Sequence, residues 1–150
     1  MLRRAFTGLL VALVVACAAA GTAVGAGASA RASVSPPCAL YAVTLVTETL
    51  VHDFNSPNLT LNAKKWPRLM AEARTARAVF VSHPRLRPAL PHYDALVTSL
   101  GSVGKLLIAG HRAAAYRRLK LAVPDLKAVV AAAKRINLVC KSGGVTLHVG

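Results

Sequence analysis

The chain has 150 residues, of which 19 are Lys or Arg and only five are Asp or Glu, so its formal net charge at pH 7 is +14. Five carboxylates leave little material for a paired general acid and base. One Trp, three Tyr and three Phe leave little for a surface that stacks nucleic-acid bases. The composition therefore disfavours a carboxylate-dependent hydrolase and a nucleic-acid-binding protein, and it indicates an anionic partner.

The first 30 residues predict an export signal. Residues 1–4 are cationic, residues 5–30 carry no charge, and small residues follow the most apolar part of this stretch. Ala-Ser-Ala at 28–30 fits the pattern at which signal peptidases cleave, so our first interpretation is a signal peptide that ends at Ala30. Residues 31–37 then form a linker. We expect the protein to be exported, and either secreted or attached to the outer face of the cytoplasmic membrane.

Two alternatives stay open for the same segment. Val14-Val15-Ala16-Cys17 resembles a bacterial lipobox, which makes residues 1–16 a lipoprotein signal and Cys17 the lipidated residue. The uncharged stretch also exceeds the roughly 20 residues that cross a bilayer, although its glycines argue against an uncut anchor. Arg3-Arg4-Ala5-Phe6 is similar to a twin-arginine signal, but two basic residues beside Met1 are also an ordinary start of a signal peptide.

Residues 38–142 predict one small helical domain. The chain from Cys38 onward is long enough for one compact core, and its Ala, Val and Leu content suits closely packed helices. Cys38 and Cys140 are the cysteines that follow the signal, and neither has a further thiol or His at the spacing of a metal site. Export into an oxidising compartment therefore predicts a disulfide between them.

Apolar periodicity predicts four helices, two of which precede His83. The first begins after Pro36-Pro37 and ends before Asn55. Its predicted core-facing residues are Leu40, Val43, Thr47, Leu50 and Phe54. The second covers 63–82, with Asn62 as its N-cap and His83-Pro84 after its end. Its predicted core-facing residues are Trp66, Leu69, Met70, Ala73 and Phe80.

The third predicted helix covers 88–109 and ends at Gly110, while Gly101 and Gly104 allow close approach of a neighbouring helix. Its predicted core-facing residues are Leu96, Val97, Leu100, Val103, Leu107 and Ile108. The fourth covers 112–141 and ends at Gly143-Gly144, which leaves 143–150 as a tail. Pro124 either kinks this helix or begins a new one. Its predicted core-facing residues are Leu119, Val123, Leu126, Val130, Ala133 and Cys140.

These elements predict an all-α fold, namely a small antiparallel four-helix bundle with up-down-up-down topology that is closed by one disulfide. In that topology the start of the first helix and the end of the fourth lie at the same end of the bundle. Cys38 and Cys140 occupy these two positions. Topology and cysteine placement therefore agree.

Basic residues predict a cationic face on the fourth helix, formed by Arg117, Arg118, Lys120, Lys127, Lys134, Arg135 and Lys141. Its four lysines recur at every seventh residue and so share one side of a helix. Such a row suits an anionic membrane surface or a cell-wall polymer, although basic residues also keep exported proteins in solution. We expect no nucleic-acid partner. The sequence thus indicates a non-enzymatic binding module of the bacterial cell envelope, with a small-ligand or haem carrier as the alternative.

Catalytic and metal-binding patterns are weak. Ser102 and Lys105 match S-x-x-K, and residues 141–143 resemble a K-T-G box, but the chain is too short for the enzymes that use them. Glu48 and His52 share a helix face beside Asp53. The residues considered as haem ligands are His52, His92, Tyr93, His111 and Tyr116. No motif supports any of these sites, so we predict no catalytic residue, metal or cofactor.

Overall fold

The structure, a computed structural model, describes residues 34–54 and 65–150. This part of the chain is mostly helical and also contains a short C-terminal hairpin. Its elements are α2 (Pro36–Asp53), α3 (Trp66–Ser82), the 3-10 helix η1 (Arg87–Ala89), α4 (Leu90–Ile108), α5 (Arg112–Arg135), β1 (Val139–Ser142) and β2 (Val145–His148). The predicted signal, the lipobox at Cys17 and the predicted cap at Asn62 lie outside the described residues. Within 34–54 and 65–150, no helix is long and apolar enough to cross a membrane.

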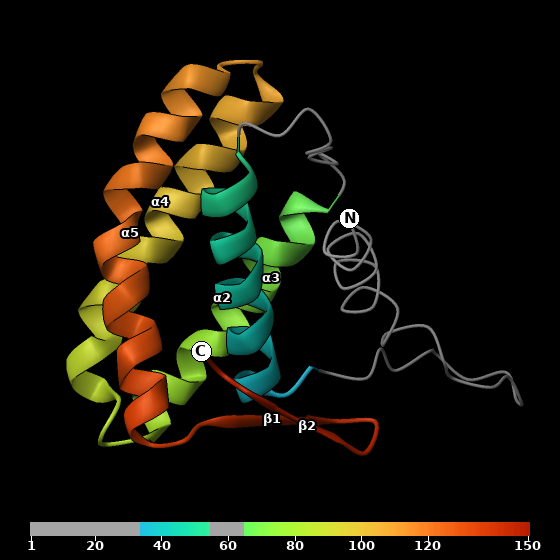
Figure 1. Cartoon of the computed structure of the whole chain (residues 1–150), viewed down its shortest axis with the longest axis vertical. Helices are drawn as coiled ribbons and strands as arrows, with labels where there is room; N and C mark the ends of the chain where they lie inside the picture. Colours follow the sequence, from blue (N-terminus) through green and yellow to red (C-terminus); the bar gives the residue numbers. More distant parts are fainter. Residues whose placement is uncertain (1–33, 55–64) are drawn as a thin grey trace, which may run out of the picture.

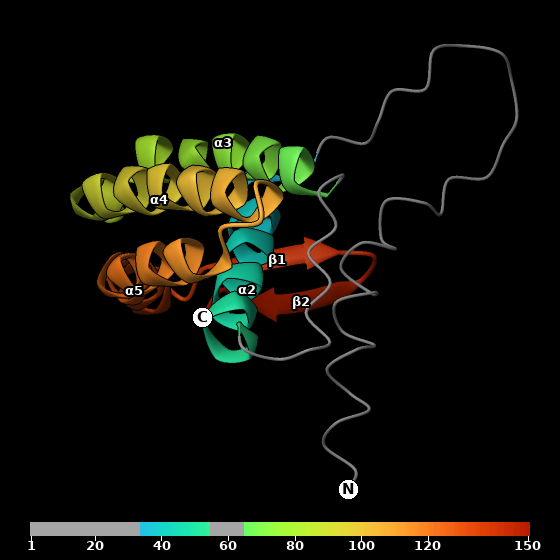
Figure 2. The same ribbon diagram turned by 90° about the horizontal axis from the view of Figure 1, so that it is seen from above.

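Consecutive helices run in opposite directions (Figure 1). α2 packs mainly against α3, and α4 packs mainly against α5 along most of its length. Figure 2 shows α3, α4 and α5 as a row with α5 at one edge, while α2 and the hairpin lie together beside the row. The outward side of α5 is therefore an outer surface of the described part of the protein.

The core-facing residues predicted for α2 are confirmed, because Leu40, Val43, Thr47, Leu50 and Phe54 are all buried. The helix begins at two prolines, which are favoured in a first turn because their missing N–H groups need no partner there. β-branched residues disfavour helix, yet here the buried threonines satisfy their hydroxyls within it. The Thr44 hydroxyl donates to Leu40 O at 3.1 Å, and the Thr47 hydroxyl donates to Val43 O at 2.7 Å.

The turn between α4 and α5 is a Schellman motif. Gly110 has φ of +79°, its N–H donates to Leu107 O at 3.1 Å, and the His111 N–H donates to Leu106 O at 2.8 Å. This confirms Gly110 as the break. The inward placement predicted for Ile108 is wrong, since its side chain is 62% exposed. α4 ends at this residue, so no facing helix covers it.

The fourth helix is six residues shorter than predicted, because α5 ends at Arg135 instead of Lys141. Asn137 adopts φ of +50°, and a second Schellman motif forms as the N–H groups of Asn137 and Leu138 donate to Lys134 O and Ala133 O. Of the two predictions for Pro124, the start of a new helix is wrong, because Pro124 lies inside α5 and on its exposed side. At this exposed position, the helical hydrogen bond that Pro124 cannot donate costs less free energy than it would in the core.

The prediction of an all-α fold is wrong at the C-terminus, where β1 and β2 form an antiparallel hairpin. Ser142 pairs with Val145, so Gly143-Gly144 is a two-residue loop with positive φ at both positions. The predicted tail at 143–150 is wrong for the same reason. Val149 is 1% exposed, and its N–H donates to Leu138 O at 3.0 Å. The end of the chain therefore belongs to the folded body.

The predicted Cys38–Cys140 disulfide is confirmed, with Cα atoms 4.5 Å apart. The prediction placed both cysteines on helices. Cys38 does lie in the first turn of α2, but Cys140 lies on β1. The bond therefore fastens the hairpin to α2, against which β1 packs. Figure 1 shows the hairpin crossing the end of the molecule where α2 begins.

Tyr93 is the largest fully buried side chain of the described core. Its ring stacks on Phe80 with centroids 4.6 Å apart, and its hydroxyl donates to Ala73 O at 2.7 Å. Burial raises the pKa of the Tyr93 phenol, and the charge of Asp94 adds to the increase. The folded protein thus keeps this phenol neutral at a pH where the unfolded chain has lost the proton.

We expect Tyr93 to make the fold sensitive to alkali. Its contribution is complete below about pH 10, the ordinary pKa of tyrosine, and declines as the pH rises above that value, by at most about 1.4 kcal/mol per pH unit. Urea unfolding at pH 9 and pH 11 measures this loss. Tyr93→Phe lacks the ionisable group and should lose less stability between the two pH values. Equal losses in both proteins would show that another group causes the dependence.

Candidate cationic face on α5

Of the seven basic residues predicted for the fourth helix, six lie on α5 and are exposed. We call this set the α5 cationic face, and it comprises Arg117, Arg118, Lys120, Lys127, Lys134 and Arg135. Lys141 is also exposed but lies on β1, so its place in the helical row is wrong. The seven-residue repeat continues in the sequence after α5 has ended, and a strand does not keep the spacing of a helix.

The lysines of the α5 cationic face form a row along the helix axis. Lys120, Lys127 and Lys134 are separated by about two turns each, so the row spans roughly 21 Å. The Lys120 ammonium lies 5.2 Å from the centroid of the Tyr116 ring, which orients it at one end of the row. The rigid backbone of α5 thus presents several positive charges at regular intervals.

Contacts with α2 hold the start of α5 in place. The rings of Tyr116 and Phe54 have centroids 4.9 Å apart. The Arg112 guanidinium lies 5.7 Å from the centroid of Phe54 and donates to Phe54 O at 2.8 Å. These contacts fix the helix that carries the cationic face against the last turn of α2.

The one acidic residue of α5 is paired with a residue of α4. Asp125 Oδ1 lies 2.8 Å from His92 Nδ1 of α4, in the seam between these two helices. No acidic side chain in the described ranges forms an ion pair with any of the six residues of the α5 cationic face. Within these ranges the six cations therefore have no carboxylate side chain as an ion-pair partner.

Cations on α3 are in a different situation, because two of them have acidic partners. Arg68 Nε lies 3.2 Å from Glu72 Oε1, and Arg77 binds Asp94 of α4 through two contacts of 2.8 and 3.0 Å. The hydrogen bond from Arg77 lowers the pKa of the Asp94 carboxyl. Acidic residues thus offset positive charge on the α3 side and leave it unopposed on the outward side of α5.

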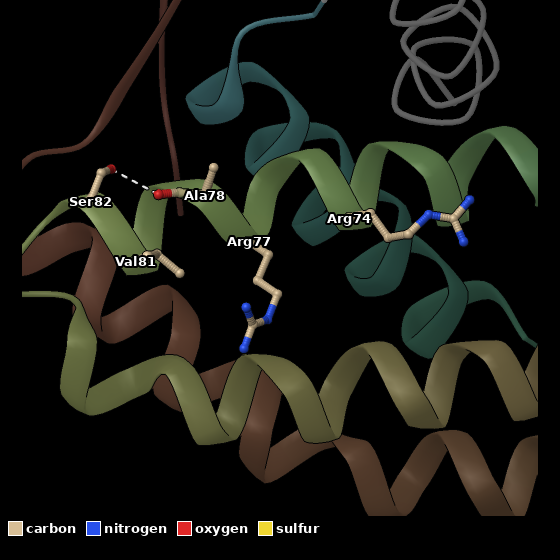
Figure 3. A pocket seen from close by; sticks show the side chains of 5 residues that line it. All are labelled: Arg74, Arg77, Ala78, Val81 and Ser82. Carbon is tan, nitrogen blue, oxygen red and sulfur yellow. Dashed lines mark hydrogen bonds between the residues drawn. The ribbon is translucent and has the colours of Figure 1, made fainter.

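A shallow hollow on α3 is lined by Arg74, Arg77, Ala78, Val81 and Ser82. Figure 3 shows that Arg77 extends toward α4, where Asp94 binds it, while Arg74 extends away from the other lining side chains. The Ser82 hydroxyl donates to Ala78 O at 2.8 Å. The polar groups of the hollow are therefore largely engaged within the protein.

The residues considered for catalysis and metal binding do not form a site among the described residues. The Ser102 hydroxyl donates to the helix carbonyl of Thr98 at 3.1 Å. Glu48 and His52 are exposed on α2. Among the side chains that the structure describes, which do not include Asp53, no group of three or more from His, Cys, Asp and Glu could hold a metal ion.

The residues considered as haem ligands have separate environments. The Tyr93 hydroxyl is buried and bound to Ala73 O, whereas the adjacent His92 is exposed and pairs with Asp125. His111 is exposed at the turn before α5, and the ring of Tyr116 packs on Phe54. The carrier alternative therefore stays a prediction without support from these contacts.

One feature of this surface was missed by the sequence reasoning. Leu121 of α5 is 69% exposed beside the cationic residues. The position of Leu121 in the sequence could have revealed this exposure. Leu121 follows Arg117 by four residues and so lies on the charged side of the helix, away from the buried Leu119 and Ala122.

Comparisons with protein-family models, with curated protein sequences and with solved structures find no match to this chain.

Proposed function

We propose that this chain is an exported antiparallel four-helix bundle protein that acts as a non-enzymatic binding module at the cell envelope, where its α5 cationic face contacts anionic surfaces. The observation that carries the proposal is the set of six exposed cations on one helix that have no acidic partner among the described residues. A disulfide is typical of exported proteins, which supports the predicted compartment.

Simple electrostatics supports this kind of binding. A Lys or Arg near a negatively charged membrane contributes about 1 kcal/mol, so several acting together give useful affinity although each is weak. The attraction falls off over about 8 Å at physiological ionic strength, which makes it sensitive to salt. Because α5 is rigid and exposed, its charges reach a surface together without first being ordered.

We expect reversal of the lysine row to abolish most of the binding. In Lys120→Glu/Lys127→Glu/Lys134→Glu, three attractive charges become repulsive, and the affinity for anionic surfaces should fall about 100-fold or more. The measurements are co-sedimentation with equimolar phosphatidylglycerol and phosphatidylcholine vesicles and retention on anionic cell-wall polymer. Both begin at low salt, and about 0.5 M salt should release the wild-type protein.

The matched control is Arg74→Glu/Arg85→Glu/Lys105→Glu, which changes the net charge by the same amount on exposed residues outside α5. The affinity of this control variant for anionic surfaces should fall less than tenfold, because only the long-range electrostatic attraction changes. Equal losses in the two triple variants would mean that net charge alone governs binding. Wild-type binding that survives about 0.5 M salt would also contradict the proposal.

A further inference from the structure

Leu121 is the most exposed large apolar side chain of the described chain, at 69%. Most of its surface is in water even though α5 buries apolar residues along its other side. Exposing an apolar side chain forgoes the free energy that its burial provides. A partner that covers Leu121 would recover that free energy.

Three cations and one acidic residue lie close to Leu121 on α5. Arg118 and Arg117 precede it by three and four residues, so they adjoin it on the helix surface, and Lys120 is adjacent in sequence. Pro124 follows by three residues and presents an exposed apolar ring on the same side. The nearby Asp125 is drawn toward His92 of α4. Cationic side chains thus adjoin Leu121 on its N-terminal side, and the one acidic neighbour is paired with His92.

We infer that the anionic surface is a lipid bilayer, with Leu121 inserted below the headgroups while the flanking arginines and Lys120 contact the phosphates. This inference rests on the proposed function and names its partner. A wall polymer or another hydrophilic polyanion binds the charges but offers no apolar phase for Leu121. A bilayer offers both at a separation that Arg and Lys side chains span, because their stems lie along apolar surface while their charged ends stay in water.

The position of α5 suits this mode of docking. α5 lies at the edge of the row of helices, with its outward side away from α4 (Figure 2). An interfacial helix of this kind lies in the plane of the membrane and buries its apolar side chains only to the level of the headgroups and upper acyl chains. The rest of the described protein then stays in water.

The test compares Leu121→Gln with Val81→Gln, which replaces a 47% exposed apolar residue on α3. The exported, oxidised protein is titrated with equimolar phosphatidylglycerol and phosphatidylcholine vesicles and, separately, with polyphosphate. Leu121→Gln should bind the vesicles about tenfold more weakly and polyphosphate as tightly as the wild type. Val81→Gln should match the wild type with both, and Leu121→Met should keep the vesicle affinity.

Fluorescence gives an independent readout. In Leu121→Trp, a new indole should shift its emission to the blue on addition of the same vesicles and be quenched by lipids brominated in their acyl chains. It should not shift with polyphosphate, and Val81→Trp should not shift with either. The native Trp66 is buried and provides a constant background.

The outcomes separate the two proposals. If the wild type binds neither vesicles nor polyphosphate at low salt, the proposed function is wrong and the inference with it. If the wild type binds both and Leu121→Gln binds vesicles as tightly, the bilayer inference alone is overturned and a hydrophilic polyanion becomes the partner. If Leu121→Gln lost affinity for polyphosphate as much as for vesicles, the bilayer inference would also be overturned. Leu121 would then affect binding through the neighbouring cationic side chains instead of through an apolar phase.

Discussion

Removal of the disulfide by Cys38→Ala/Cys140→Ala is expected to lower the free energy of unfolding by about 4 kcal/mol. The bond joins residues that are 102 positions apart, so it restricts almost the whole described chain when the protein is unfolded. Small domains are stable by only about 5 to 15 kcal/mol, and this loss is therefore a large share. The expected result is a protein that folds at low temperature and unfolds well below the melting temperature of the wild type.

The loss of stability should be greatest at the hairpin. β1 and β2 are four residues each, and a hairpin of that size is marginal in water unless it packs on something else. The disulfide attaches the hairpin covalently to α2, and Cys140, its partner on β1, is buried with 3% of its surface exposed. Amide exchange in Val139–His148 should therefore accelerate more than exchange in α4 and α5.

Urea unfolding of three samples measures the effect, namely the oxidised wild type, the reduced wild type and the double variant. The reduced wild type and the double variant should unfold at similar urea concentrations, and reductant should not change the double variant. A difference below about 1 kcal/mol between oxidised and reduced wild type would contradict the prediction. That result would mean that packing of the hairpin against α2 is sufficient without the bond.

Gly104→Ala is expected to destabilise the fold by about 2 kcal/mol. Gly104 is buried on α4, and a Cβ atom there would overlap the indole ring of Trp66 at the start of α3. The ring is itself buried, so either the indole or the helix backbone must move, which costs about 1 to 3 kcal/mol or more. Alanine is the better helix former by about 1 kcal/mol, and this partly offsets the loss.

Gly101→Ala is the matched control on the same helix, one turn earlier. Its Cβ would meet Met70 Cε at 3.6 Å, an ordinary contact with a flexible side chain. This variant should be neutral or more stable by up to about 1 kcal/mol. Urea unfolding compares both variants with the wild type. Equal effects at the two positions would contradict the assignment of Gly104 as the place of close approach.

A second substitution tests the cause. If the indole ring is what the new methyl group displaces, Trp66→Leu should be less costly in the Gly104→Ala protein than in the wild type, because the smaller side chain leaves room for that group. A double-mutant cycle measures this coupling. Additive effects would show that the strain lies elsewhere in α4.

Much of the helical core was predictable because the positions that face it recur with the period of a helix. On α2 the seam from Leu40 to Phe54 is buried throughout. The disulfide was predictable for a different reason, since export and the scarcity of thiols left Cys38 one partner in the domain. Neither inference required knowledge of how the helices cross.

The C-terminal region shows where that reasoning stopped. Cys140 follows Ala133 by seven residues, so the helical period continued across Asn137, whose positive φ ends the pattern. Val139 to His148 carries a hairpin signal, namely β-branched residues on both sides of Gly-Gly, which we interpreted as a helix end. The signal is only four residues long on each side.

Local pattern in this chain was sufficient for the existence and order of the four helices, for the glycine that separates α4 from α5, and for the pairing of Cys38 with Cys140, because each depends on the spacing and chemistry of a few residues. Which charges stay unopposed depended on contacts between distant segments. Asp125 turns to His92, Asp94 binds Arg77, and Leu121 stays uncovered at the edge of the helix row. Periodicity assigns a residue to one side of a helix, but only the packed structure decides whether a neighbour lies there.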